Sequence, residues 1–241
     1  MFKETNIRSF AKGFSWRIIA TLTTIIIVYL FFGRLDLAIA AGAIEWISKI
    51  FLFWMHERVW LKIRWGKKRI TPFNVWMTGL PLSGKTAIAD KVFEKLNKNN
   101  LPLQRIDSKD VRLLIPDIGY SRNDRINHIK RIGYLVKTLH GNYISTICSF
   151  VSPYRKARKA VREMVKNNVF VYVKANIETC KLRDYKGVYK KAINGEIKNF
   201  TGIDDVFEEP QNADIIIDTD LTNIDQASET IVNYLKKYYL K

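Results

Sequence analysis

The central part of the chain carries the run Gly79-Leu80-Pro81-Leu82-Ser83-Gly84-Lys85-Thr86. This run fits the pattern G-x-x-x-x-G-K-[ST], in which glycines let backbone N–H groups wrap nucleotide phosphates at the N-terminus of a helix. The flanking sequence supplies the required context, since residues 73–78 predict a short buried strand and residues 87–96 carry apolar side chains at helical spacing. We therefore predict that all eight residues bind ATP, and that the run is not a chance glycine-rich turn.

The last two residues of the loop have distinct predicted roles. Lys85 is expected to reach the β- and γ-phosphates and to act as a catalytic residue, whereas the Thr86 hydroxyl is expected to ligate Mg²⁺. The sequence thus predicts ATP as a substrate and Mg²⁺ as the cofactor.

Strands and helices are predicted to alternate after the loop. The predicted strands span residues 103–107, 143–149, 169–174 and 215–218, and the predicted helices span residues 124–139, 154–165 and 177–183, with a final helix that ends near residue 238. This alternation predicts an α/β protein of the P-loop NTPase class, in which helices cover both faces of a parallel sheet in three layers. Ligands of such folds bind at the carboxyl ends of the strands, where Thr78, Asp107 and residues 149–153 fall.

Composition and charge restrict the class of partner. The chain has 241 residues, enough for one sizeable domain and a small one, and a formal net charge of +17. The candidates for an anionic partner are nucleic acid, membrane phospholipid and a phosphorylated small molecule. Residues 1–70 hold twelve Lys or Arg against four Asp or Glu, a net +8 that anionic lipid accounts for. The rest suits ATP and a charged nucleotide, so we predict no nucleic-acid partner. The two cysteines, Cys148 and Cys180, lack the spacing of a zinc site and predict reduced thiols in a core.

Residues 1–70 predict a two-helix transmembrane hairpin, and residues 71–241 predict the P-loop domain. Two apolar stretches within residues 18–55 are each close to the length that spans a bilayer and are expected to contact membrane lipid. Basic residues flank both outer ends, which places both termini and the P-loop domain in the cytoplasm. Glu45 and Lys49 lie four residues apart and are expected to neutralise each other. A cleaved signal peptide and the core of a soluble helical domain are the alternatives.

The hairpin segment resembles a small two-helix family of predicted membrane proteins of unknown function over about residues 5–67. The resemblance implies a membrane location and no chemistry. His56 is interpreted as an interfacial polar residue, with a ligand or proton carrier as the alternative. The residues that carry the resemblance are Ser9, Lys12, Trp16-Arg17, Thr23-Thr24, Gly33, Glu45, Lys49, His56-Glu57-Arg58, Trp60 and Trp65-Gly66.

A lysine- and glycine-rich segment over about residues 185–204 interrupts the alternation and predicts a lid that excludes water. It contains KGVYKKA from Lys186 and GEIKNFTGID from Gly195. These runs closely resemble the lid of adenylyl-sulfate kinases, and the resemblance extends from about Phe73 to the C-terminus. It implies that ATP and adenylyl sulfate are the substrates and that the γ-phosphoryl group passes to the ribose 3′-hydroxyl, a step of sulfate activation and assimilation. The resemblance leaves a homodimer open as the assembly.

The resemblance also implies residue roles. Arg112 and Arg125 would contact the anionic part of the acceptor, because guanidinium groups suit phosphate and sulfate. Phe200 would stack on the acceptor adenine, with Tyr120 as the second aromatic. The remaining implied residues are His128 and Lys186 at the acceptor, Asp107 as a catalytic residue and metal ligand, and Ser152 as a catalytic residue. Ser152 is assigned either to a phosphoserine intermediate or to binding of the acceptor.

The sequence departs from the family at two positions. The family's Asp-Gly-Asp-Asn is here Asp107-Ser108-Lys109-Asp110, and His128 replaces an asparagine. A lysine in place of the second carboxylate reverses the local charge, so that either Asp110 substitutes or Asp107 acts alone. Two alternative functions stay open: a kinase for another nucleotide-linked acceptor such as cytidine diphosphoramidate, and a degenerate ATP-binding membrane scaffold.

Overall fold

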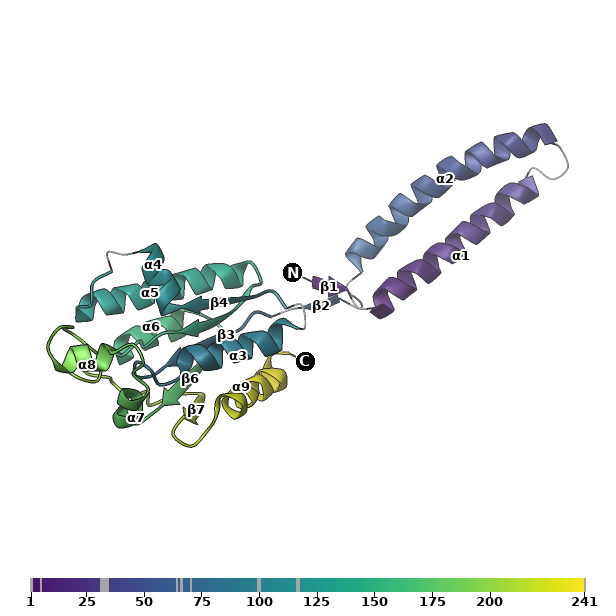
Figure 1. The fold of residues 1–241 in the computed structure, drawn as a ribbon. Coiled ribbons are helices and arrows are strands. Elements are labelled where there is room, and N and C mark those ends of the chain that lie inside the picture. The colour runs from purple at the N-terminus through teal and green to yellow at the C-terminus, as the bar shows by residue number, and fades with distance from the viewer. Residues whose placement is uncertain are drawn as a thin grey trace. The chain divides into compact units, whose positions relative to one another are not determined.

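The computed structural model describes residues 2–4, 6–30, 35–63, 65, 67–69, 71–98, 101–115 and 118–240. The chain divides into two compact units, residues 1–70 and 71–241 (Figure 1).

The second unit is built on a five-stranded parallel sheet with the strand order β4-β5-β3-β6-β7. The central strand is buried along its whole length and pairs Val75 with Ile147 on one side and with Val169 on the other. The elements in chain order are β3 (Asn74–Thr78), α3 (Lys85–Asn97), β4 (Leu103–Asp107), α4 (Ser108–Leu114), α5 (Arg122–Gly141), β5 (Ser145–Ser149), α6 (Arg155–Met164), β6 (Asn168–Lys174), α7 (Ile177–Leu182), α8 (Val188–Ile193), β7 (Ile215–Asp218) and α9 (Ile224–Tyr238).

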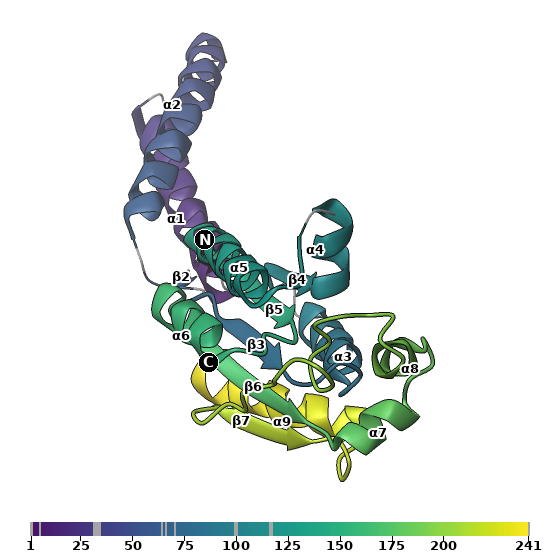
Figure 2. The ribbon, with the colours of Figure 1, turned by 90° about the vertical axis from the view of Figure 1, so that its left-hand side faces the viewer.

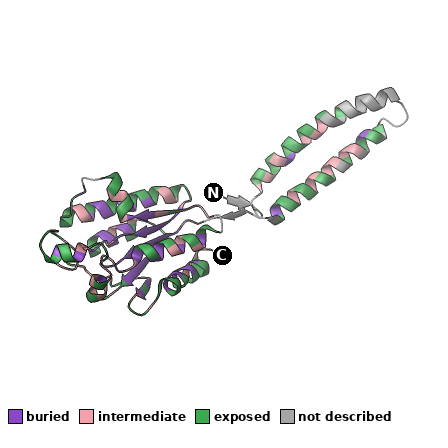
Figure 3. Cartoon of the chain, in the orientation of Figure 1, coloured by how far each residue is buried: buried purple, intermediate pink, exposed green. Residues whose placement is uncertain are grey.

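Helices cover both faces of this sheet. Helices α3 and α9 pack together on one face, over the core that contains Val75 and Met77. Helices α5 and α6 pack together on the other face, over the core around Trp76 (Figure 2). Successive side chains of a strand point to opposite faces, so β3 needs apolar residues at consecutive positions when both faces are buried. Figure 3 shows the strands as the buried layer of the unit.

The predicted α/β class and parallel sheet are confirmed, and two helices were missed. Helix α4 buries none of its side chains and exposes Leu113 and Leu114, so it has no apolar face that a pattern could reveal. Helix α8 lies in the segment predicted as an irregular lid and buries only Tyr189 and Ala192. The start of α5 is fixed by a capping box at Ser121.

The first unit contains two long helices that pair antiparallel. They are α1 (Asn6–Leu30) and α2 (Leu35–Lys62), and short strands pair Phe2–Glu4 (β1) with Lys67–Arg69 (β2). Ser15 Oγ lies 2.8 Å from His56 Nε2, and buried Arg8 donates to the carbonyl oxygens of Trp60, Ile63 and Trp65 at the end of α2.

Within the described residues, one segment of the first unit, Ile7–Val28, is long and apolar enough to cross a membrane. The sequence predicts a tight turn at residues 33–36 between the two helices; residues 33–34 of this turn, and the Glu45 side chain of the predicted Glu45–Lys49 pair, lie outside the described residues. The prediction of two membrane spans is therefore supported in the structure by one helix.

Candidate active site

The phosphate-binding loop connects β3 to α3 and contains two glycines at which a side chain would clash or would strain the backbone. A Cβ atom on Gly79 would lie 2.2 Å from the carbonyl oxygen of Val173, so the strand and loop meet too closely for a side chain. Gly84 has a φ of +96°, in the region that favours glycine, and α3 begins at the next residue. The loop thus ends at a helix N-terminus, where backbone N–H groups favour an anion.

Lys85 is folded back onto this loop. Its side chain is buried, and Nζ donates to the carbonyl oxygen of Leu80 at 2.6 Å and to Ser83 Oγ at 3.3 Å. Burial lowers the pKa of Lys85 to about 8, although the charge of Asp107 acts in the opposite direction. A phosphate oxygen in the loop would restore a full counter-charge to this amine.

Asp107 ends β4 and accepts three hydrogen bonds. The donors are Thr86 Oγ1 at 2.9 Å, Ser149 Oγ at 2.5 Å and the backbone N of Lys109 at 2.8 Å. Burial opposes ionisation, but these bonds and the nearby Arg105 lower the pKa of Asp107 below its usual value. The site therefore presents an ionised carboxylate beside the Thr86 hydroxyl.

Thr86 and Asp107 form an oxygen pair of the kind that holds Mg²⁺ together with substrate phosphates. No group of three or more His, Cys, Asp or Glu residues with metal-binding geometry occurs in the part of the chain that the structure describes. These two residues would thus be incomplete as a metal site without phosphate oxygens.

A cavity of about 830 Å³ lies along the carboxyl ends of the strands and joins the two predicted halves of the site. Gly79, Leu80 and Ser83 are outside its lining, on the inner side of the loop. The predicted site residues that line it are Pro81, Leu82, Gly84, Lys85, Thr86, Asp107, Arg112, Tyr120, Arg125, His128, Ser152, Lys186 and Phe200. Arg183, Tyr185 and Lys198 also line the cavity, and the sequence had assigned no individual role to these three residues.

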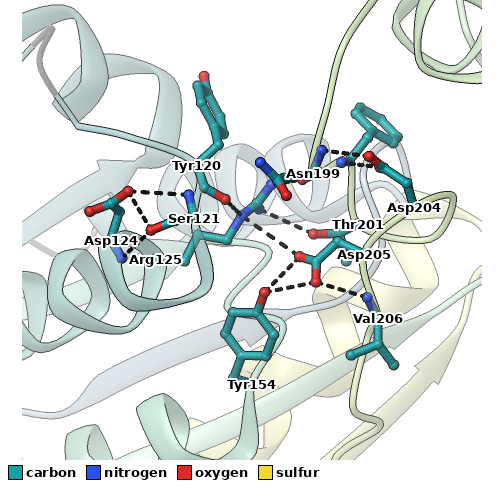
Figure 4. Close-up of polar contacts among 11 residues, drawn as sticks. Tyr120, Ser121, Asp124, Arg125, Tyr154, Asn199, Thr201, Asp204, Asp205 and Val206 are labelled. Carbon is teal, nitrogen blue, oxygen red and sulfur yellow. Dashed lines mark hydrogen bonds and ion pairs between the residues drawn. The ribbon is translucent and has the colours of Figure 1, made fainter. Parts of the chain in front are cut away.

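Arg125 connects α5 to the lid (Figure 4). Its guanidinium donates to the carbonyl oxygen of Tyr120 at 3.0 Å, to Thr201 Oγ1 at 3.1 Å and to the carbonyl oxygen of Asn199. Its Nε lies 3.8 Å from an oxygen of Asp205, which also accepts from the Tyr154 hydroxyl at 2.7 Å. Most donors of Arg125 are thus used within the protein, and the lid segment is fixed against α5.

The aromatic residues of the lid are held by a second set of contacts. The Tyr189 hydroxyl donates to the carbonyl oxygen of Pro81 at 3.0 Å, which ties α8 to the phosphate loop. The Phe200 ring packs edge-on against Tyr189 with centroids 4.9 Å apart. Asp204 accepts from the backbone N of Asn199 and of Phe200. Phe200 therefore reaches the cavity from a turn that its neighbours determine.

The acceptor half of the cavity places a cation against an aromatic ring. The Arg112 guanidinium lies 4.2 Å from the centroid of Tyr120 and donates to the carbonyl oxygen of Ile118 at 2.9 Å. Tyr120 is 53 % exposed, and the Arg125 guanidinium also lies 5.4 Å from the centroid of its ring, so two cations flank this aromatic residue.

His128 is buried at the wall of the cavity without a hydrogen bond. It is 3 % exposed, and neither ring nitrogen has a partner among the described residues. Its ring meets Phe150 edge-on with centroids 5.9 Å apart. Burial and then the charges of Arg112 and Arg131 lower the pKa of His128 to about 4, so the imidazole is neutral near pH 7.

Ser152 turns its hydroxyl into the protein. The side chain is 2 % exposed, its Oγ donates to Thr78 Oγ1 at 3.0 Å, and it accepts from Trp76 Nε1 at 3.2 Å. The Ser152 hydroxyl therefore uses its proton in one hydrogen bond and a lone pair in another, both to residues of β3.

Lys109 faces the cavity and Asp110 does not. The Asp110 carboxylate instead binds Arg105 at 3.1 Å on the surface. Among the described residues that line the cavity, Asp107 is the sole carboxylate, beside the cations Lys85, Lys109, Arg112, Arg125, Arg183, Lys186 and Lys198.

The parallel sheet, the phosphate loop around Lys85 and the cation-rich cavity define a P-loop phosphotransferase. The family described as Adenylylsulphate kinase matches residues 71–218, and the chain belongs to this family. Residues 10–61 match a second family, described as "Predicted membrane protein (DUF2061)".

Similar proteins agree with this assignment. An adenylyl-sulfate kinase of Halothermothrix orenii is 43 % identical over 165 residues, 68 % of this chain and 89 % of the relative. One of Thermodesulfovibrio yellowstonii is 46 % identical over 167 residues, 68 % of this chain and 84 % of the relative. Among solved structures, the APS kinase of Mycobacterium tuberculosis in complex with AMPPNP and APS has a TM-score of 0.67 and 29 % identity, covering 70 % of this chain and 99 % of that one.

Proposed function

We propose that residues 71–241 form an adenylyl-sulfate kinase domain, and that residues 1–70 hold it at a membrane. In this proposal the domain transfers the γ-phosphoryl group of ATP to the ribose 3′-hydroxyl of adenylyl sulfate and gives 3′-phosphoadenylyl sulfate. The observation that carries the proposal is the cavity of about 830 Å³, which joins the phosphate loop to the arginine and aromatic side chains of the predicted acceptor half. Its volume lies in the range of small-molecule sites.

In the ATP half, the residues of the loop bind and orient the triphosphate. Lys85 exchanges its bonds to Leu80 and Ser83 for the β- and γ-phosphate oxygens, and gains charge stabilisation there. Thr86 and Asp107 would hold Mg²⁺ together with the phosphates, and the ion would neutralise phosphate charge there. The contacts of Asp107 with Ser149 and Thr86 keep this carboxylate ionised and oriented.

In the acceptor half, charge and stacking position the nucleotide. Phe200 and Tyr120 provide aromatic faces for its adenine, and Arg112 and Lys186 bind its anionic part. His128 provides one hydrogen-bond donor and one acceptor as a neutral imidazole. Arg125 acts mainly by holding the lid, residues 185–204, over the reacting groups, which excludes water from the transfer.

We propose direct in-line transfer, in which Ser152 is a positioning residue. Its hydroxyl already bonds Thr78 and Trp76, and a nucleophile would have to abandon both partners. Phosphoryl transfer needs positioning and charge stabilisation more than a protein nucleophile. The phosphoserine role considered from the sequence is therefore not part of this mechanism.

Membrane attachment is proposed through residues 18–55, with both termini and the kinase domain in the cytoplasm. Large apolar side chains of α1, including Phe10, Phe14, Leu22 and Ile26, are exposed, and exposed apolar surface on a long helix suits lipid. The match to a membrane-protein family supports the same reading. Complete recovery of the protein in the soluble fraction without detergent would contradict it.

The deciding assay incubates the purified full chain with Mg-ATP and adenylyl sulfate and detects the 3′-phosphorylated product. Product formation is expected. Normal ATP binding without product would reject adenylyl sulfate as the acceptor.

Because Lys109 lines the cavity in place of a carboxylate, two other functions also need to be tested. These are a kinase for another nucleotide-linked acceptor, for example cytidine diphosphoramidate, and an ATP-binding membrane scaffold. Should the parent chain be inactive, Lys109→Asp separates them: recovered activity on adenylyl sulfate indicates a degenerate kinase, and continued inactivity favours another acceptor.

A further inference from the structure

The positive charge of the kinase unit is concentrated in one layer of the fold. Residues 71–241 hold 28 Lys or Arg and 19 Asp or Glu, a net +9. Residues 122–166, which contain α5 and α6, hold 11 Lys or Arg and 2 Asp or Glu, also a net +9. The remaining residues of the unit, with 17 of each sign, are therefore neutral as a set.

Part of this charge is neutralised by acidic residues outside the layer. Arg122 pairs with Glu208 at 2.8 Å and Arg162 with Asp214 at 3.1 Å, while Arg158 is buried. The exposed cations whose side chains form neither an ion pair nor a hydrogen bond within the described residues are Lys130, Arg131, Lys137, Lys156 and Lys166, while the Arg155 side chain donates to the carbonyl oxygen of Glu209. Lys130 and Lys137 lie two helical turns apart on α5. Tyr134 is between them and is 66 % exposed, the kind of side chain that is enriched at bilayer interfaces.

The opposite layer has a different charge arrangement. On α3 and α9, lysines face acidic residues of the neighbouring helix, as in Lys95–Glu229 at 2.8 Å and Lys91–Asp225 at 3.6 Å. Lys236 and Lys237 at the end of α9 are exposed and form no ion pair among the described residues, so this layer keeps two such cations against five on the α5–α6 layer. The asymmetry therefore selects the α5–α6 layer as the binding surface.

The residue that follows the end of the α6 segment contacts the start of β3 within the kinase unit. Asn167, which follows Lys166, donates from Nδ2 to the carbonyl oxygen of Pro72 at 3.1 Å, and its own carbonyl oxygen accepts from Asn74 N at 3.0 Å. Only nine residues, 63–71, separate the end of α2 from Pro72. The α6 end of the basic layer therefore contacts the first residues of the kinase unit.

We propose that the outer surface of the α5–α6 layer docks on anionic phospholipid. The inference rests on the proposed membrane attachment and does not depend on the proposed reaction. Lysine and arginine side chains near an anionic bilayer each strengthen binding about fivefold, and the attraction falls off within a Debye length. Five such cations on one layer make the docked state strongly dependent on lipid charge and salt.

The test uses the full chain with a fluorophore on one of two matched cysteines, Thr138→Cys on α5 or Thr230→Cys on α9. Both threonines are exposed, and each hydroxyl bonds the carbonyl four residues earlier, at 3.1 Å and 3.0 Å. The native Cys148 and Cys180 are buried and stay unlabelled. The protein is placed in vesicles of phosphatidylcholine, with or without phosphatidylglycerol, that carry a headgroup quencher.

The label at position 138 is expected to be quenched in the anionic vesicles, to recover at high salt and to stay bright in neutral vesicles. The label at position 230 is expected to stay bright in both. The double variant Lys130→Glu/Lys137→Glu should lower the docked-to-undocked ratio more than 20-fold, as two lost lysines imply. The matched control Lys236→Glu/Lys237→Glu on α9 changes the net charge equally and should leave docking intact.

Co-flotation with vesicles separates the two proposals. Failure to co-float would contradict membrane attachment itself. A protein that co-floats while positions 138 and 230 respond alike would overturn the docking surface. A label at position 138 that responds to an added RNA duplex and not to phosphatidylglycerol would also overturn it. That result would indicate a nucleic-acid partner. ATP binding checks the fold of the variants, since neither Lys130 nor Lys137 lines the cavity.

Discussion

Replacement of His128 by asparagine tests how the buried imidazole is tolerated. The ring is 3 % exposed, and neither nitrogen has a protein partner among the described residues. The pKa is about 4 in the folded chain against 6.5 for a free histidine. Below pH 6.5 the unfolded chain binds a proton at this position and the folded chain does not, so stability falls as pH drops from 6.5 toward 4.

The size of the effect follows from the two pKa values. A difference of this size corresponds to about 3 kcal/mol of folding free energy, lost between pH 6.5 and pH 4. Asparagine does not titrate, so the His128→Asn variant does not lose this folding free energy as the pH falls. This holds whether the variant is more or less stable than the parent at pH 7. The kinase unit of the variant is therefore expected to lose about 3 kcal/mol less than the parent over this range.

Amide hydrogen exchange in β3 and β5 of the full chain measures the opening free energy of the kinase unit alone. Both proteins are measured at pH 7 and pH 4.5, and the change with pH is compared between them, so that other titrating groups cancel. Equal losses in the two proteins would show that His128 is charged or solvated in the folded state, and would refute the buried neutral imidazole.

Three further predictions concern the phosphate half. Asp107→Asn should lower kcat at least 100-fold, because the ionised carboxylate is lost. ATP binding without Mg²⁺ should be retained, and a Mg²⁺ titration of both proteins checks this. ATP affinity should fall by about tenfold between pH 7 and pH 9, because Lys85 loses its proton as the pH rises through about 8. Lys85→Arg should remove this dependence, and calorimetry at pH 7 and 9 measures it. Ser152→Ala should keep kcat within about tenfold of the parent and lose about 1 kcal/mol of stability, as a lost buried hydrogen bond implies; complete loss of turnover in a folded variant would restore the phosphoserine route.

The fold could be predicted because its determinants are local. The glycine pattern of residues 79–86 needs no tertiary information, and neither do β3 and β6, which carry consecutive apolar residues on both faces. Helices α4 and α8 escaped because they are short and bury few side chains. Their positions depend on what they pack against, which periodicity does not record.

The sequence listed residues that the structure brings to one cavity, but it did not predict the contacts that hold them. Arg125 was expected at the acceptor anion, but it bonds Asn199 and Thr201, more than 70 residues away in the chain. Tyr189 holds the phosphate loop and Arg183 bonds Thr219, and neither contact has a signal in its local sequence. Such partners are set by the way the lid folds over the sheet, so only the structure reveals them.

The lysine at position 109 is less disruptive than the sequence suggests, because Asp107 depends on the backbone of residue 109 and not on its side chain. The N–H of Lys109 donates to Asp107 at 2.8 Å, and Ser149 and Thr86 supply the other bonds. Every side chain at position 109 except that of proline would preserve this contact. The ammonium instead adds positive charge to the acceptor half, where negative charge accumulates during phosphoryl transfer. We therefore expect the lysine to leave the ATP half intact and, of two acceptors, to affect activity least toward the more anionic one.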